Sequence, residues 1–181
     1  MDTAGGAPRP ITQPGNVARP SWSHDGNWIY YAWNAGSDWQ VWKVDWRRPD
    51  RRERVTQNGG FEAYESVDGT FLYYSRDAEL WRKALPSGPE ERLLTGIENG
   101  WWSLAPSGLY FVRFGQDLFA NDSKNVNFFD FRTREISQVT SITGIVYAYR
   151  PDFCVSPDGK TILYGLQQVS NTEIRMVDNF R

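Results

Sequence analysis

The stretch SWSHDGNWIYYAW, residues 21–33, recurs in related form at three other places in this chain of 181 residues. The later copies read YESVDGTFLYYSR from Tyr64, SLAPSGLYFVRF from Ser103 and CVSPDGKTILYGL from Cys154. Each copy contains a glycine, and the four glycines are Gly26, Gly69, Gly108 and Gly159. They follow one another at intervals of roughly 40 to 50 residues, a period typical of repeat proteins. The chain is therefore expected to consist of repeated structural units.

Each copy reads as a strand, a tight turn and a second strand. Structural turns are assigned to four residue pairs, which are Asp25 and Gly26, Asp68 and Gly69, Ser107 and Gly108, and Asp158 and Gly159. Such pairs favour hairpins in which glycine adopts a positive φ. A third strand is expected in every unit and a fourth in three of them, which fits the period of roughly 40 to 45 residues of four-stranded propeller blades. The sequence thus predicts an all-β fold, a β-propeller of about four blades of four antiparallel strands each.

The predicted blade units cover residues 17–60, 61–100, 101–144 and 145–181, after a disordered or linker segment at 1–9. The segment PITQPGN, residues 10–16, is expected to be the last strand of a preceding or closing blade. It can complete the fourth unit in a closed four-bladed ring, because that unit ends at its third strand. Alternatively the chain is a partial propeller, either the C-terminal half of a larger one or half of an eight-bladed ring of two copies. The strand count favours a partial propeller, whose exposed edges predict self-association.

Two segments carry a family resemblance. SWSHDGNWIYY and, above all, SPDGKTILY at residues 156–164 resemble the PD40-type, WD40-like repeats of TolB-like β-propellers. The closing EIRMVDNFR resembles the C-terminal end of propellers that follow winged-helix DNA-binding or Ser/Thr kinase domains in multidomain bacterial regulators. The resemblance implies a non-catalytic module that binds a protein, a peptide or a small ligand, within a larger bacterial protein. It also implies a periplasmic or other extracytoplasmic location, although the chain shows no signal-peptide pattern.

Composition excludes several other classes of function. Lys and Arg number 20 against 22 Asp and Glu, and the pI is about 5.5, so no basic footprint for nucleic acid is present. No apolar run is long enough to insert into a membrane. The one cysteine, Cys154, cannot form an internal disulfide or a cysteine-based zinc site. No cofactor and no metal site are predicted. The single histidine, His24, lies beside Asp25 at the first turn and is interpreted as a turn variant, because neighbours in a hairpin do not converge as a catalytic triad must.

The ligand face is expected where the loops between blades meet the loops between second and third strands. The candidate ligand-binding residues there are Phe61, Glu62, Trp101, Trp102, Tyr147, Tyr149, Arg150 and Asp152. Flat rings give contact area and charges fix orientation, which suits a peptide or a sugar. Packing between blades is the rival role for these rings, and the sequence favours it. Trp42 and Trp81, at matching positions of third strands, are assigned to the core.

Three further alternatives follow from local patterns. The insertion at residues 114–125 offers Asp117, Asn121 and Asp122 to calcium, but the EF-hand pattern is absent and a solvated loop is favoured. The run at 46–54 is basic and is interpreted as a solvated face, with binding of an acidic partner as the alternative. An enzyme is the rival to a binding module, either a glycan-cleaving propeller using carboxylates such as Glu62 and Asp152 or the accessory propeller of a serine peptidase. No nucleophile elbow or kinase loop occurs in the chain.

Overall fold

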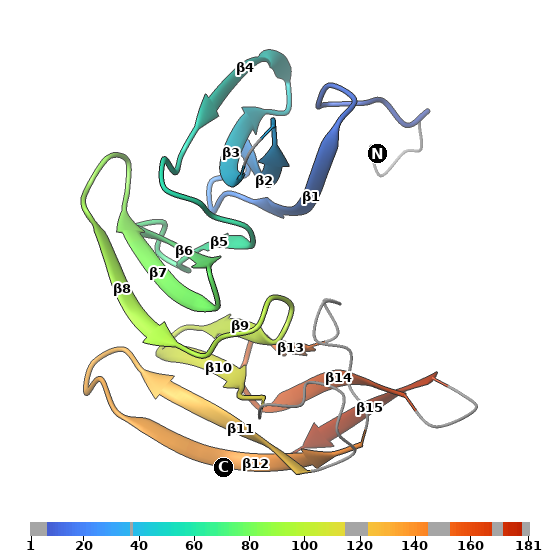
Figure 1. Cartoon of the computed structure of the whole chain (residues 1–181), viewed down its shortest axis with the longest axis vertical. Helices are drawn as coiled ribbons and strands as arrows, with labels where there is room; N and C mark the ends of the chain where they lie inside the picture. The colour runs from blue at the N-terminus through green and yellow to red at the C-terminus, as the bar shows by residue number, and fades with distance from the viewer. Residues whose placement is uncertain (1–6, 37, 115–122, 145–152, 168–171, 179–181) are drawn as a thin grey trace. The chain divides into compact units, whose positions relative to one another are not determined.

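The computed structural model describes residues 7–36, 38–114, 123–144, 153–167 and 172–178. All regular structure in these residues is β-strand, arranged in four antiparallel sheets in which consecutive strands are neighbours (Figure 1). The predicted fold class is confirmed: the chain is an all-β propeller of four blades. Three blades have four strands each, and the fourth has three in the described part of the chain.

The blades follow one another along the sequence. The first contains β1 (Asn16–Trp22), β2 (Trp28–Asn34), β3 (Trp39–Asp45) and β4 (Arg48–Arg54). The second contains β5 (Ala63–Glu65), β6 (Phe71–Arg76), β7 (Glu79–Ala84) and β8 (Glu90–Thr95). The third contains β9 (Trp102–Ala105), β10 (Gly108–Val112), β11 (Ser123–Asp130) and β12 (Ile136–Thr143). The fourth contains β13 (Phe153–Val155), β14 (Thr161–Gln167) and β15 (Thr172–Asp178).

The central strands of the blades are the aromatic runs of the repeat. In β2 the buried Tyr31 pairs with Trp42 of β3, and the buried Ala32 pairs with Val41. Burial on both faces explains why these runs are almost continuously apolar. By contrast β4 is an edge strand with the sequence RPDRRER, and it is mostly exposed. Charge and proline on an edge oppose unwanted pairing with another chain.

The chain divides into two compact units, residues 1–64 and residues 65–181. Within the second unit, a hydrophobic core joins the third and fourth blades and contains Trp101, Tyr110, Ile142 and Phe153. Strands β9 and β13 lie beside each other, and the Val155 N–H donates to Ser103 Oγ at 3.2 Å. The first strands of these two blades are thus neighbours, as the inner strands of a propeller are.

Three of the hairpin turns share one hydrogen-bond pattern. In the first, Ser23 Oγ donates to Asp25 Oδ1 at 2.6 Å and accepts from the Trp28 N–H at 2.9 Å. The Gly26 N–H donates to the Ser23 carbonyl at 3.0 Å, and Gly26 has φ +67°. The turns at Asp68 and Asp158 repeat the serine-to-aspartate bond at 2.6 Å. The glycine is therefore the fourth residue of each turn, where φ is positive. The serine hydroxyl, two residues before the aspartate, holds the aspartate carboxylate in place.

The third turn is built differently. Gly108 is not in the positive-φ region expected for it, and it pairs with Ala105 as the first residue of β10. Only Pro106 and Ser107 form this shorter turn, because one residue is missing after the glycine. A Cβ at position 108 would overlap the Phe129 carbonyl and the Phe128 ring. Close approach between strands, rather than a positive φ, requires glycine there.

The start of the chain also differs from the expected strand at residues 10–16. Residues 10–15 form no strand, and β1 begins at Asn16. Pro10 and Pro14 lack the N–H that a strand ladder needs, which explains the irregular backbone. Among the described residues, no helix has the length and apolar character needed to cross a membrane.

Candidate ligand-binding groove

The predicted ligand residues are mostly buried where the structure describes them. Trp101 and Trp102 have exposed fractions of 0% and 2%. Trp101 packs edge-on against Phe114, with ring centres 5.4 Å apart. These two tryptophans therefore fill the interior of the second unit, which was the rival interpretation. Four further candidates precede the fourth blade and lie outside the described residues: Tyr147, Tyr149, Arg150 and Asp152.

Phe61 and Glu62 belong to a closed polar cluster of the first unit. Arg19 lies at a bulge of β1 with φ +55°, and its Nη1 is 3.8 Å from Glu62 Oε1. The Arg19 guanidinium is also 5.5 Å from the centre of the Phe61 ring. The Tyr64 hydroxyl donates to Glu62 Oε1 at 3.4 Å. A bulge commonly changes the direction in which a side chain points, and here it places the Arg19 guanidinium beside the buried Glu62 carboxylate.

The charges of this cluster stabilise the chain internally and do not face solvent. Glu62 is 1% exposed, so its charge requires the nearby guanidinium. Burial raises the pKa of the Tyr64 phenol, and the negative charge of Glu62 raises it further. The Ser21 hydroxyl donates to the Ala63 carbonyl at 2.6 Å and ties the same segment to β1. The arrangement fixes the end of the connection before β5 and offers little surface to a ligand.

The first turn shows no catalytic arrangement. His24 is exposed, and Ser23 donates its hydroxyl hydrogen to Asp25 within the turn. This hydrogen bond and those from Asn27 lower the pKa of Asp25 to about 2. In the part of the chain that the structure describes, no three His, Cys, Asp or Glu side chains are grouped to hold a metal ion. The calcium alternative, Asp117, Asn121 and Asp122, lies outside the described residues.

Arginines cover several tryptophan rings of the first and second blades. The Arg47 guanidinium is 4.2 Å from the Trp46 ring centre, and that of Arg51 is 4.8 Å from Trp28. The two tryptophans assigned to the core, Trp42 and Trp81, are both half-buried. Trp42 packs edge-on against Trp33 at 4.9 Å, whereas Trp81 lies 3.5 Å beneath the Arg76 guanidinium. Side chains of the chain itself thus occupy these ring faces.

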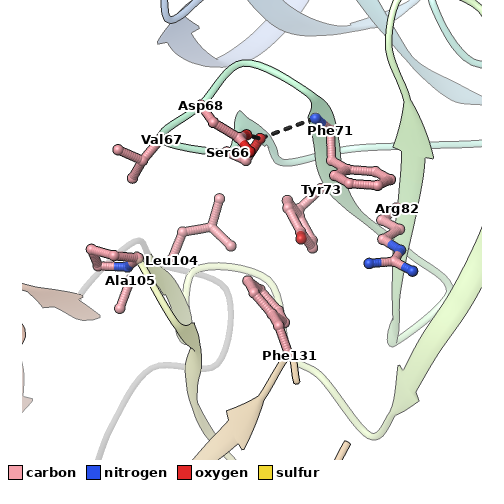
Figure 2. A pocket seen from close by; sticks show the side chains of 10 residues that line it. Ser66, Val67, Asp68, Phe71, Tyr73, Arg82, Leu104, Ala105 and Phe131 are labelled. Carbon is pink, nitrogen blue, oxygen red and sulfur yellow. Dashed lines mark hydrogen bonds between the residues drawn. The ribbon is translucent and has the colours of Figure 1, made fainter. Parts of the chain in front are cut away.

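A groove of about 450 Å³ in the second unit was not predicted from the sequence. Figure 2 shows side chains from the second and third blades pointing toward one another across it. Its lining residues are Ser66, Val67, Asp68, Phe71, Tyr73, Arg82, Leu104, Ala105, Pro106 and Phe131. A volume of this size lies in the range of small-molecule and short-peptide sites, roughly 300 to 1,000 Å³.

One side of the groove is a ladder of side chains across three strands. Tyr73 of β6 pairs with Arg82 of β7, and Arg82 pairs with Glu91 of β8. Phe71 lies two residues before Tyr73, so the alternation of a strand puts both rings on the same face. The Arg82 guanidinium is 4.6 Å from the centre of the Phe71 ring. Local strand geometry alone therefore assembles this aromatic and cationic wall.

The third blade supplies another part of the lining. Phe131 follows β11 directly, and its ring stacks on Tyr73 with centres 4.9 Å apart and planes 11° apart. Leu104 of β9 and Pro106 of the next turn add apolar surface. Val67, at the tip of the turn after β5, is 64% exposed at the rim. Val67 therefore extends the apolar surface of the groove to its rim, where a ligand can cover it.

Ion pairs outside the groove hold Arg82, the one arginine among its lining residues. Arg82 Nη2 is 2.7 Å from Glu91 Oε2, and Arg134 Nη2 is 2.7 Å from Glu91 Oε1. Hydrogen bonds from both arginines lower the pKa of Glu91. Burial raises the pKa of the Tyr73 phenol, while the hydrogen bond and the positive charge of Arg82 oppose that rise. At neutral pH the groove therefore carries a neutral phenol beside the Arg82 guanidinium.

Comparisons with solved structures identify the fold. TolB from Acinetobacter baumannii is 17% identical with a TM-score of 0.73, and the match covers 90% of this chain and 41% of that one. A protein assigned as TolB from Agrobacterium tumefaciens is 18% identical with a TM-score of 0.67, over 97% of this chain and 63% of that one. An oligogalacturonate lyase from Vibrio parahaemolyticus is 14% identical with a TM-score of 0.64, over 86% of this chain and 48% of that one.

These likenesses confirm the TolB-like propeller fold that the repeats predicted. The chain spans less than two thirds of each of the three proteins, with 41%, 63% and 48% of their lengths covered. No protein-family model matches the sequence, and the search of curated proteins found no match.

Proposed function

We propose that this TolB-like propeller is a non-catalytic binding module and that its ligand site is the groove between the second and third blades. The observation that carries the proposal is the combination of a hollow of about 450 Å³ with Val67 exposed by 64% at its rim. The rings of Tyr73 and Phe131 supply rigid contact area, and Arg82 supplies a fixed charge. Aromatic and arginine side chains are the groups that contribute most to protein recognition.

The state of the carboxylates supports binding over glycan cleavage. Glu62, the described carboxylate of the enzyme alternative, is 1% exposed and lies beside Arg19. A glycan-cleaving acid must reach the bond that it breaks. The partner in this proposal is a protein or a peptide, and the module acts within a larger bacterial protein outside the cytoplasm. The resemblance to TolB-like propellers motivates both parts of that setting.

The experiment is an NMR titration of the isotope-labelled chain with a neutral, end-blocked peptide, Ser-Ser-Trp-Ser-Ser-Ser. The expected result is a set of amide shifts confined to the neighbours of Phe71, Tyr73 and Phe131. Val67→Asp, at the exposed rim, should abolish these shifts without changing the rest of the spectrum. Val17→Asp is the matched control, because it puts the same charge on an exposed valine of the first unit. Shifts that lie elsewhere, or that survive Val67→Asp, would contradict the proposed site.

A further inference from the structure

Two guanidinium groups share one carboxylate beside the groove: Arg82 lines the groove, and Arg134 lies just outside the lining. Arg82 and Arg134 both pair with Glu91, each at 2.7 Å. Arg82 Nε donates to Glu91 Oε2 as well, at 2.8 Å. The three side chains together carry one positive charge, and each arginine has five N–H donors, more than Glu91 can accept. This end of the groove is therefore suited to a second carboxylate.

The opposite end of the groove carries a negative charge. Asp68 accepts hydrogen bonds from Ser66 at 2.6 Å and from the Thr70 hydroxyl at 2.7 Å, and these bonds lower the pKa of Asp68 to about 2. In Figure 2 Asp68 and Arg82 lie on opposite sides of Tyr73. A charged ligand is therefore oriented along the groove, with its anionic part toward the arginines and away from Asp68.

The apolar surface indicates the size and type of the ligand. The ring of Phe131 is half-buried on Tyr73, and Leu104 and Pro106 form the facing wall. A single flat ring placed there would leave Val67 exposed at the rim. An extended chain that inserts one ring and continues over the rim would cover Val67 as well. The surface thus fits a peptide segment better than a small aromatic acid.

We infer that the groove takes an extended peptide segment in which an aromatic side chain is followed on one side by acidic side chains. The aromatic ring packs between Leu104 and the Tyr73–Phe131 stack, and the acidic side chains pair with Arg82 and Arg134. This inference rests on the proposed function, because it names the partner of the same groove. A hydrogen bond between charged groups is stronger than a neutral one, so the acidic residues supply preference as well as affinity.

The test compares three end-blocked peptides by fluorescence anisotropy: Ser-Ser-Trp-Asp-Asp-Ser, its lysine counterpart Ser-Ser-Trp-Lys-Lys-Ser, and the neutral serine peptide. We expect the acidic peptide to bind at least about tenfold more tightly than the lysine peptide, which corresponds to roughly 1.4 kcal/mol. Arg134→Gln should reduce this preference to about threefold or less, because it removes one of the two guanidinium groups. Arg134 is partly exposed at a surface turn, so the variant is expected to fold.

Arg132→Gln is the matched control, since it removes the same charge two residues earlier in the same turn and should keep the preference. Equal binding of the acidic and lysine peptides, or equal effects of the two substitutions, would overturn the inference. In that case binding of the neutral peptide to the groove would leave the proposed function standing. If none of the three peptides shifts the amides that line the groove, the proposed site itself is wrong and the inference falls with it.

Discussion

At the scale of single residues, the buried carboxylate of Glu62 is stabilised by a nearby arginine and a tyrosine hydroxyl. Glu62 is buried, yet its carboxylate has Arg19 at 3.8 Å and the Tyr64 hydroxyl at 3.4 Å. Arg19 reaches this position only because its backbone adopts φ +55° at the bulge of β1. Such a conformation costs a non-glycine residue about 1 to 2 kcal/mol, so the contacts that it makes must offset the strain.

Removal of Arg19 is therefore expected to be costly. Arg19→Met should lower the free energy of unfolding by roughly 3 to 5 kcal/mol, because a buried carboxylate then lacks its compensating charge. The measurement is urea unfolding followed by tryptophan fluorescence. The double variant Arg19→Met with Glu62→Gln should recover part of the loss, since it removes the buried charge too. Arg54→Met, on the exposed edge strand, is the control. An equal effect of both arginine substitutions would contradict the anchoring role.

At the scale of structural elements, the serine–aspartate turn recurs in three hairpins with almost the same geometry. The positive φ of its glycine is +67° at Gly26, +69° at Gly69 and +69° at Gly159. In each turn the aspartate accepts the serine hydroxyl at 2.6 Å and a backbone N–H two residues later. The three repeats therefore share the same hydrogen-bonded turn geometry as well as similar residues.

These turns predict an acid-sensitive stability. Hydrogen bonds lower the pKa of Asp25 and of Asp68 to about 2 in the folded chain, against roughly 3.9 in an unfolded chain. A lowered pKa stabilises the fold above the unfolded value, and the contribution is lost as the pH falls from about 4 to 2. Unfolding measured across that window should show the loss, and Asp25→Asn should reduce its size. A variant with an unchanged acid profile would show that the first turn contributes nothing to it.

Glycine has two different roles in the hairpins, and substitution should separate them. Gly26→Ala should cost about 1 to 2 kcal/mol of unfolding free energy, since only the positive φ opposes alanine and no atom lies within 4 Å of the added Cβ. Gly108→Ala should cost more, because the Cβ would overlap the Phe129 carbonyl and the Phe128 ring. Thermal unfolding of both variants gives the comparison. A larger loss for Gly26→Ala would contradict the steric role of Gly108.

The sequence predicted these elements better than it predicted the site. The strands follow from aromatic runs and turn residues that are adjacent in the chain, so local patterns suffice for them. The groove depends on Tyr73 stacking against Phe131 across two blades, and no local pattern brings those rings together. Trp101 resembled a loop residue but is fully buried, because the hydrophobic core continues past the strand ends. The signal available for the groove was Val67, an apolar residue at the tip of a polar turn.

At the scale of the whole molecule, two of the three most exposed large apolar side chains of the described residues lie on the last strand. Ile174 is 81% exposed and Met176 is 61% exposed, and alternation along β15 puts both on one face. In the described part of the chain β15 is the edge strand of a three-stranded sheet, whereas the other three blades have four strands. An apolar edge strand pairs readily with another chain. This surface is where a fourth strand from the same chain or from another copy would be added.

We therefore expect the chain to self-associate through β15. Native mass spectrometry across a concentration series should show a dimer that grows with protein concentration. The double variant Ile174→Glu with Met176→Glu should restore the monomer, because two charges on the edge oppose pairing. Val17→Glu, on a valine of β1 that is 39% exposed, should leave the dimer in place. A concentration-independent monomer that unfolds cooperatively would contradict the prediction and would mean that the four blades close within one chain.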